Sequence, residues 1–423
     1  MHWEHSADYR EWTYRLRPDV RWHDGRPVTM DDVEFTLRLH SRPDSPYWGP
    51  SLVEALTVHD EATFTVRGTG WSDAAVSILP KHLVQGLDYQ KFYDWDFWLR
   101  PVGNGPYRYV RHEPQTMVEL EANPGYYKGK PRIARVVLKF AGPSGLTELL
   151  SGNVDAIETN PAQLPSIAND PRFRTFWELN PHGPWTIVWQ NEHPLFRERE
   201  VRRALSLAIN RRELLQVLNL PSQCSRVDGL YTKRQFQRGD GTEPRYDPAE
   251  ARRLLDQAGW RQRNRDEMRE RGGHDFHFTA LTLAEFPGAE TAVYLQDQLR
   301  RIGVNMELQH FERGVLLDRL KTGKFESILG FMIDPKSFGE PGGIGYRNAQ
   351  MTTLVQVART TADPDALDQA YREMSELLRV DQPVAFLFRR AVPHVVHRRV
   401  QGLIDMQRAN PLLFTEDLWL EER

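Results

Sequence analysis

Residues 10–33 read REWTYRLRPDVRWHDGRPVTMDDV. Apolar and polar residues alternate over residues 12–16, which is the period of a half-buried strand. The dipeptide Asp24-Gly25 predicts a turn, and Thr29 can cap the helix that begins after it. The stretch therefore predicts a strand, a tight turn and a capped helix.

His23 and Asp24 in the same stretch could also form a catalytic His-Asp pair. A catalytic histidine needs a positioned partner beyond its neighbour in the sequence, and the sequence indicates none. We therefore interpret His23 and Asp24 as part of the turn that joins the strand to the helix.

The composition is that of a folded, charge-balanced protein. The chain has 423 residues, which is room for two or three domain-sized units. Hydrophobic residues make up 40% and charged residues 27% of the chain, which is typical of a globular protein. The 55 basic residues nearly balance the 58 acidic ones, and this balance argues against nucleic acid as a partner. No apolar run approaches the length of roughly 18 residues that predicts a membrane span.

The sequence contains no signature of catalysis or metal binding. Cys224 is the only cysteine, which excludes an internal disulfide and a cysteine-based metal cluster. Phosphate-binding loops, nucleophile elbows and His-Glu-x-x-His motifs are absent, and the run GGIG is too short for a dinucleotide fingerprint. The pairs His274/His277 and His394/His397 have a spacing that puts the two rings on opposite faces of a strand. We expect no catalytic residue, no metal and no cofactor.

The predicted elements change in kind along the chain. Strands are predicted within residues 57–66, 116–123 and 130–140, with few helices between them. Helices become prominent from about residue 195. Helix and strand alternate over residues 289–333, which implies crossover connections and a largely parallel sheet.

An arginine-rich amphipathic segment lies at residues 197–218. A helix there places Val201, Leu205, Ala208 and Ile209 on one face and arginines on the other. We interpret the arginine face as a solvated helix surface rather than a nucleic-acid patch.

Two further helices have predicted N-caps, Asn210 and Asp247. Between the second of these helices and the next strand, residues 261–273 read RQRNRDEMRERGG. This run is too charged for a core and predicts a surface excursion.

Seven segments form an ordered series that resembles a known family. In chain order they are LRPDVRWHDGRPVTMDDV, PVGNGPYRYVRHEPQTMVELEANPGYYKGKPRI, LLSGNVDAIE, HPLFREREVRRALSLAINRREL, YDPAEARRLLDQAGW, LQDQLRRIGVNMELQHF and YREMSELLRVDQPVAFLF. Together they resemble the peptide/nickel-type extracytoplasmic solute-binding proteins of ABC importers, the oligopeptide- and dipeptide-binding family. The resemblance covers nearly the whole chain.

The resemblance implies an α/β fold, the two-lobed periplasmic-binding-protein fold with mixed sheets and a hinge that the chain crosses twice. We expect lobe I to comprise residues 1–190, lobe II residues 191–385, and residues 386–423 to return to lobe I. Members of the family carry an export signal and further strands before the segment that matches residues 12–16. We therefore expect an N-terminally truncated chain and a periplasmic or extracytoplasmic location.

The resemblance also implies a ligand site between the lobes, at the crossings and at nearby strand ends. At the first crossing, Trp189 could present an aromatic wall and Asn191 an amide. The alternative for Trp189 is packing in the core of its lobe.

The second expected place is the end of the strand in SILGFMIDPKSF, residues 327–338. Gly330, Phe331 and Asp334 match the family's Gly-Trp-x-x-Asp pattern, whose acid receives a peptide's α-ammonium group in peptide-binding relatives. The alternative is that Asp334 only opens a turn before Pro335.

The third place is TALTLAEFPG, residues 279–288. Dipeptide-binding relatives place an arginine in this stretch to hold the peptide carboxylate. Glu285 and Phe286 occupy the region here, a departure that puts dipeptide specificity in doubt. The twelve tryptophans leave room for a sugar-stacking pocket.

The resemblance therefore predicts the substrate-binding component of an ABC importer, a monomer that captures a peptide or a related solute and delivers it to permease subunits. It implies that the protein captures its ligand by lobe closure and that no covalent bond is made or broken. The alternatives are an oligosaccharide-binding member of the same family and the ligand-sensing domain of a transcriptional regulator with the same fold.

Overall fold

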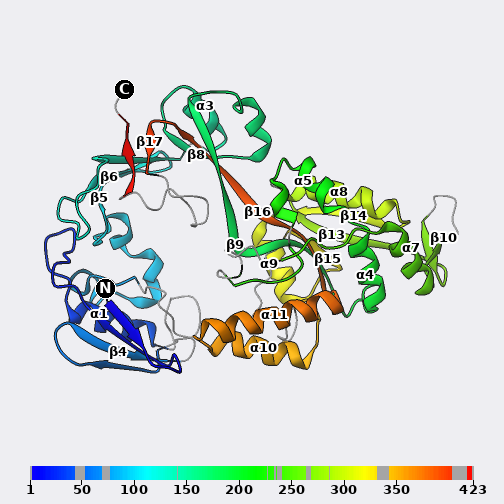
Figure 1. Cartoon of the computed structure of the whole chain (residues 1–423), viewed down its shortest axis with the longest axis horizontal. Coiled ribbons are helices and arrows are strands. Elements are labelled where there is room, and N and C mark those ends of the chain that lie inside the picture. The colour runs from blue at the N-terminus through cyan, green and yellow to red at the C-terminus, as the bar shows by residue number, and fades with distance from the viewer. Residues whose placement is uncertain are drawn as a thin grey trace.

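Two groups of elements, joined by two long strands, make up the chain in the computed structural model (Figure 1). The structure describes residues 2–42, 53–68, 77–140, 142–225, 227–232, 235, 241–262, 268–284, 286–330, 343–402 and 417–421. The first group holds both ends of the chain, and the second holds its middle (Figure 1). The joining strands are β9 (Phe173–Trp189) and β16 (Val384–His397).

The first group begins with a four-stranded antiparallel sheet in the order β1-β2-β4-β3, covered by helix α1. Its elements are β1 (His2–His5), β2 (Glu11–Arg15), α1 (Met30–His40), β3 (Ala55–Val58) and β4 (Thr63–Arg67). Trp12 and Tyr14 are buried, and Tyr14 stacks on Phe64 with ring centroids 5.2 Å apart. The alternation predicted for residues 12–16 is confirmed.

The rest of the first group consists of short helices, a second, three-stranded antiparallel sheet in the order β5-β6-β7, and strand β8, which pairs with β16. Its elements are α2 (Lys81–Val84), η1 (Tyr89–Asp94), η2 (Asp96–Leu99), β5 (Tyr107–Glu113), β6 (Met117–Ala122), β7 (Arg135–Lys139), η3 (Gly142–Ser144), α3 (Gly145–Leu150), β8 (Ala156–Glu158) and η4 (Pro161–Ser166). The C-terminal pair β17 (Val400–Gln401) and β18 (Trp419–Leu420) lies against the same group, because the Arg132 guanidinium sits 5.8 Å from the centre of the Trp419 ring.

A six-stranded sheet in the order β14-β13-β15-β9-β16-β8 runs through the second group. Its strands from that group are β13 (His277–Leu283), β14 (Asn305–Phe311) and β15 (Ser327–Leu329). Strand β13 pairs in parallel with β14 and with β15, which confirms the crossover connections predicted for residues 289–333. The pairs β15–β9, β9–β16 and β16–β8 are antiparallel, so the sheet is mixed.

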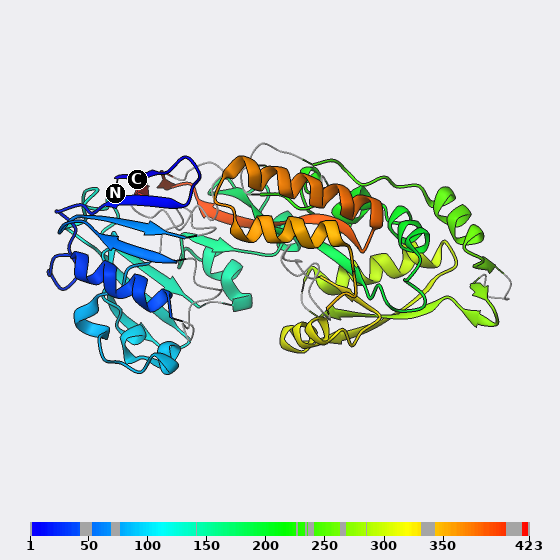
Figure 2. The same cartoon turned by 90° about the horizontal axis from the view of Figure 1, so that it is seen from below.

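Helices pack around these strands, as the second view shows (Figure 2). The helices and short strands of the second group are α4 (Arg199–Leu207), α5 (Arg211–Val217), η5 (Ser222–Ser225), α7 (Pro248–Gln257), β10 (Arg261–Gln262), β11 (Arg269–Arg271), β12 (His274–Asp275), α8 (Gly288–Arg300), α9 (Arg313–Thr322), α10 (Ala349–Thr360) and α11 (Pro364–Asp381). The largest buried apolar cluster lies here, and smaller clusters lie in the first group.

The strands β9 and β16 belong to both groups. At one end β16 pairs with β8, and at the other end β9 pairs with β15. The ladder between them is irregular between Phe386 and Phe388 and again between Arg389 and Ala391. The predicted double crossing therefore corresponds to one antiparallel strand pair. The lobe boundaries after residues 190 and 385 stay a prediction.

Two predicted caps are confirmed by side-chain hydrogen bonds. The Asn210 side chain accepts from the backbone N–H of Glu213 at 3.2 Å. The Asp247 carboxylate accepts from the backbone N–H of Glu250 at 2.9 Å. In both cases the cap satisfies one of the backbone donors that the first turn of a helix leaves without a partner.

The solvated arginine face predicted for residues 197–218 is wrong for two of its arginines. Arg202 and Arg211 are buried. Arg202 donates to the carbonyl oxygens of Phe196 at 2.6 Å and Gln382 at 3.0 Å. The guanidinium groups serve as multiple donors to backbone carbonyls, and this pairing allows an arginine to be buried.

The surface excursion predicted for residues 261–273 also needs correction at Arg269, which is buried. Its guanidinium donates to the Ile302 carbonyl at 2.7 Å and to Asp256 Oδ1 at 2.6 Å. One arginine of the charged run thus ties the short strand β11 to the end of α7 and to the turn after α8.

Candidate functional site

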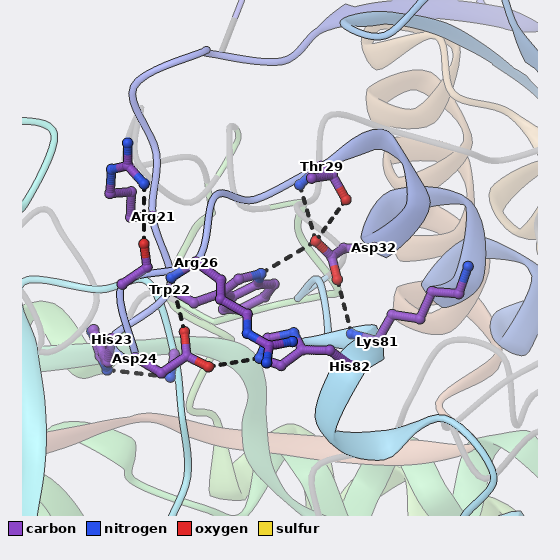
Figure 3. A network of polar contacts seen from close by, with 11 residues as sticks. Arg21, Trp22, His23, Asp24, Arg26, Thr29, Asp32, Lys81 and His82 are labelled. Atoms are coloured by element: carbon purple, nitrogen blue, oxygen red, sulfur yellow. Dashed lines mark hydrogen bonds and ion pairs between the residues drawn. The ribbon is translucent and has the colours of Figure 1, made fainter.

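The His23-Asp24 stretch forms a structural network (Figure 3). The backbone N–H of Gly103 donates to His23 Nδ1 at 3.2 Å, so Nε2 carries the ring proton and donates to the Gly105 carbonyl at 3.0 Å. Burial lowers the pKa of His23, which keeps the ring neutral. Asp24 pairs with His82 Nε2 at 2.7 Å. Both ring nitrogens of His23 thus bond to the backbone of the turn at 103–105. This confirms that His23 and Asp24 have a structural role in their turn.

Asp32 joins the same region around the start of α1 (Figure 3). Its carboxylate is buried and accepts hydrogen bonds from the backbone and hydroxyl of Thr29, at 2.9 and 3.1 Å. It also accepts from the indole N–H of Trp22 at 3.2 Å and the backbone N–H of Lys81 at 2.9 Å. One carboxylate therefore fixes the helix start, the preceding turn and α2, which confirms Thr29 as the residue from which the helix begins.

A pocket with a volume of about 190 Å³ lies where the two groups meet along β16, and we call it the interlobe pocket. Its lining comes from the first group (Glu158, Thr159, Asn160, Pro161), from the second group (Leu220, Phe286, Pro287) and from β16 (Phe388, Ala391, Val392, Pro393). Because the lining belongs to both sides of the joining strands, a change in the angle between the groups changes the pocket.

The polar wall of the interlobe pocket comes from the segment after β8. The Thr159 backbone N–H donates to the Pro393 carbonyl at 3.0 Å, and the Asn160 side chain accepts from the Ala162 N–H at 2.9 Å. The Glu158 carboxylate is exposed and makes no hydrogen bond or ion pair with the residues that the structure describes. This carboxylate is thus available to a cationic or hydrogen-bond-donating ligand.

The apolar wall includes the rings of Phe286 and Phe388, and the Trp185 ring packs against Phe388. The Trp185 and Phe388 rings are stacked, with centroids 5.8 Å apart and an interplanar angle of 8°. Gly330, at the end of β15, lies so close to this indole that an added Cβ would be 2.5 Å from Trp185 Cζ3. Sequence reasoning missed Trp185, although an aromatic residue at the start of an apolar strand run was a visible signal.

The structure places Trp189 and Asn191 away from the interlobe pocket. Strand β9 rises about 3.3 Å per residue, so Trp189 lies about 13 Å along the strand from Trp185. Trp189 is fully buried and packs against Phe196, which is the core alternative stated for it. Asn191 is buried, and its amide donates to backbone carbonyls, including that of Ile344 at 3.0 Å.

Of the other four predicted ligand residues, the structure describes only Phe286. Phe286 is partly buried and lines the interlobe pocket. Phe331, Asp334 and Glu285 lie outside the described residues. Their described neighbours Gly330 and Phe286 lie at the carboxyl ends of the parallel strands β15 and β13, where ligand sites of open α/β sheets gather.

The histidine pairs have separate surroundings. His394 is buried with Nε2 2.9 Å from Glu178, whereas the His397 ring lies edge-on to Phe173. Within the described part of the chain, no group of three or more His, Cys, Asp or Glu residues is arranged to hold a metal ion. The same residues contain no helix that is both long and apolar enough to cross a membrane.

Comparisons with known proteins agree on one family. The sequence model described as bacterial extracellular solute-binding proteins, family 5 Middle, matches residues 1–339. The oligopeptide-binding protein AppA of Bacillus subtilis is 23% identical over 404 residues, covering 88% of this chain and 74% of that protein. A relative from Brucella ovis is 27% identical over 320 residues, covering 72% of this chain and 58% of that protein.

Solved structures show the same fold. The ABC transporter substrate-binding protein CtaP of Listeria monocytogenes has a TM-score of 0.83 at 20% identity, covering 100% of this chain and 90% of that chain. AppA of Bacillus subtilis in complex with a nonapeptide has a TM-score of 0.78 at 20% identity, covering 100% of this chain and 89% of that chain. These likenesses confirm the predicted two-lobed fold. The family match over residues 1–339 shows that the chain belongs to family 5 of the bacterial extracellular solute-binding proteins.

Proposed function

We propose that this chain is the substrate-binding component of an ABC importer, which captures a peptide between its two lobes and delivers it to a membrane permease. Family membership supports the binding role. AppA, a relative that covers most of the chain, is an oligopeptide-binding protein, and its solved structure holds a nonapeptide. CtaP, with the same fold, is an ABC transporter substrate-binding protein.

The observation that carries the proposal is the lining of the interlobe pocket by residues from both groups and from β16. A ligand that contacts Glu158 on one side and Phe286 on the other is bound best when the groups close over it. Differential affinity of this kind shifts the population toward the closed form. The permease can then distinguish loaded from empty protein by shape.

Within this function we assign the ligand's α-ammonium group to Asp334 and an apolar side chain of the ligand to Phe331 and Phe286. Glu285 stays a predicted ligand residue of the same site. Trp189 and Asn191 are assigned to the lobe core instead, because their described contacts are with the protein itself. An enclosed carboxylate–ammonium pair selects strongly, since a ligand without the amine leaves a buried charge uncompensated.

The proposed role is capture without turnover, by a monomer in an extracytoplasmic compartment. Every relative compared above is a binding or transport protein in name. In the described residues, the polar groups of the pocket are one free carboxylate, a threonine and an asparagine, a set suited to hydrogen bonding.

The test is a calorimetric titration of peptides with a free and with an acetylated amino terminus against wild type and Asp334→Asn. We expect the substitution to lower the affinity for the free peptide roughly a hundredfold or more, as for a buried pair left with one uncompensated charge. Acetylation should then matter for wild type and little for the variant, because both changes remove one interaction.

The matched control is Asp318→Asn, an exposed acid on α9, which should leave both affinities unchanged. Equal binding of free and acetylated peptides by wild type would contradict the assignment of Asp334. Binding of neutral oligosaccharides without binding of any peptide would contradict the proposal that the ligand is a peptide and would favour the oligosaccharide alternative.

A further inference from the structure

A second, larger pocket lies on the second lobe and shares no lining residue with the interlobe pocket. Its volume is about 460 Å³, and it is formed by α4, the start of α5, residues 242–245, the C-terminal end of α11 and the first residues of β16. The hydrogen bond from Arg202 to the Gln382 carbonyl fixes α4 against the end of α11. Five arginines and three carboxylates line it, and we call it the arginine pocket.

Arg211 forms the floor of the arginine pocket. It is buried, and its guanidinium donates to the carbonyl oxygens of Phe386, Ser206 and Ile209 at 2.8, 2.7 and 2.9 Å and to the Ser206 hydroxyl at 3.0 Å. Burial lowers the pKa of Arg211 to about 10, so the group stays charged at neutral pH. None of these partners is a carboxylate. The hydrogen bonds of this buried guanidinium thus all go to neutral groups. The Glu243 carboxylate, which itself pairs with Arg212, favours the charged form of Arg211, and a bound anion would stabilise that charge further.

The arginines at the rim are free or weakly engaged. Arg203 makes no hydrogen bond or ion pair with the described residues. Arg199 pairs with Glu200, Arg379 with Glu376 and Arg245 with Asp247, and the side chains of these three arginines are half exposed or more. Exposed pairs between near neighbours in sequence contribute little free energy, so an incoming anion can replace them.

Two of the three carboxylates of the pocket, Asp228 and Glu243, have other partners in the protein. Asp228 accepts from the backbone N–H of Thr242 at 3.0 Å and from the hydroxyls of Thr242 and Tyr231. Glu243 forms a two-pronged pair with Arg212, with N–O distances of 2.9 and 2.7 Å. Asp228 and Glu243 therefore have partners that are not arginines of the pocket, whereas Glu376 pairs with the pocket arginine Arg379.

We propose that the arginine pocket is a second binding site, for a small oxyanion that carries a phosphate group or several carboxylates. The planar guanidinium fork matches both groups through paired hydrogen bonds, and four rim arginines around a charged floor can surround one such ligand. The volume admits a molecule larger than a single phosphate. The site is independent of the interlobe pocket and of the peptide proposed for it.

The test uses inorganic pyrophosphate and citrate as probes, titrated by calorimetry at constant ionic strength into wild type, Arg203→Ala and Arg379→Ala. The matched control is Arg301→Ala, which removes an equally exposed arginine paired with Asp297 outside the pocket. We expect saturable binding with one site, weakened about tenfold or more by each pocket variant and unchanged by the control. A preference for pyrophosphate assigns the phosphate class, and a preference for citrate the polycarboxylate class.

Failure of both probes to saturate wild type at millimolar concentration would overturn the proposal. So would an equal loss of affinity in Arg301→Ala, because binding would then follow overall charge. Peptide binding measured in the same variants separates the two sites. We expect the affinity for peptide to be unchanged in Arg203→Ala, even where the affinity for the anion is reduced.

Discussion

Trp185 and Phe388 stack in parallel across the strand pair that joins the two lobes, with centroids 5.8 Å apart. They face each other in the register of β9 and β16, next to the first irregularity of that ladder. Phe388 lines the interlobe pocket, and Trp185 is shielded behind it. The stack therefore connects the pocket wall to the hinge, and changes at its edge should affect both stability and closure.

Gly330→Ala should destabilise the fold. The backbone of Gly330 has φ +108, and a Cβ would lie 2.5 Å from the Trp185 ring. The left-handed conformation costs about 1 kcal/mol and the clash about 1–3 kcal/mol more. Gly86→Ala is the control, since Gly86 has φ +87 and nothing within 4 Å of an added Cβ. Denaturant unfolding should show the larger loss for Gly330→Ala, and equal losses would mean that the contact with Trp185 is unimportant.

Phe286→Ala should weaken peptide binding about tenfold while changing the free energy of unfolding much less than a core substitution. Phe286 is partly buried and forms part of the pocket wall, so a bound apolar group loses its contact surface. Val293→Ala on the neighbouring helix is the control, because Val293 is 59% exposed and outside the pocket. The prediction fails if both variants bind peptide with wild-type affinity.

Trp189→Ala should reduce stability rather than affinity. The side chain is fully buried against Phe196 and Phe278, so its truncation should cost about 3–5 kcal/mol. Trp189→Phe should cost much less, because it also removes an indole N–H that has no hydrogen-bond partner. Unfolding midpoints and peptide titrations of the folded variants separate these effects. A Trp189→Ala variant that is stable but no longer binds peptide would instead place Trp189 in the ligand site.

The His23→Gln variant should have a flatter dependence of stability on pH. Burial holds the folded pKa of His23 below the ordinary value of 6.5. The unfolded chain therefore binds the proton first, and wild-type stability should fall as pH drops from 6.5 toward the folded pKa. The slope contributed by one group is at most about 1.4 kcal/mol per pH unit. Urea unfolding between pH 7 and pH 5 measures the difference, and identical slopes would contradict a neutral, buried His23.

The local elements of the chain could be predicted from the sequence because their signals are local. Alternation over residues 12–16, the caps Asn210 and Asp247 and the turn at Asp24-Gly25 each depend on neighbours in the chain. The buried arginines could not be predicted in this way. Arg211 and Arg202 donate to carbonyls of Phe386 and Gln382, far along the sequence, and only the fold brings these groups together.

The lining of the interlobe pocket could be predicted less completely for the same reason. The expectation for Trp189 and Asn191 relied on their nearness to a strand end, but the structure puts them at the end of β9 remote from the interlobe pocket. The pocket instead combines Phe286 with Glu158 and Phe388, which are separated by more than a hundred residues in each direction. Strand order and direction decide which segments meet at the pocket, and no single segment of the sequence determines either.

The central claim, that a peptide is captured between the lobes, is tested most directly by small-angle X-ray scattering with and without a saturating peptide. Saturation is established by calorimetry on the same sample. We predict that the radius of gyration falls on binding, and that Phe286→Ala reaches the same compact form only at a higher peptide concentration. A peptide that saturates the protein while leaving the radius of gyration unchanged would contradict capture between the lobes.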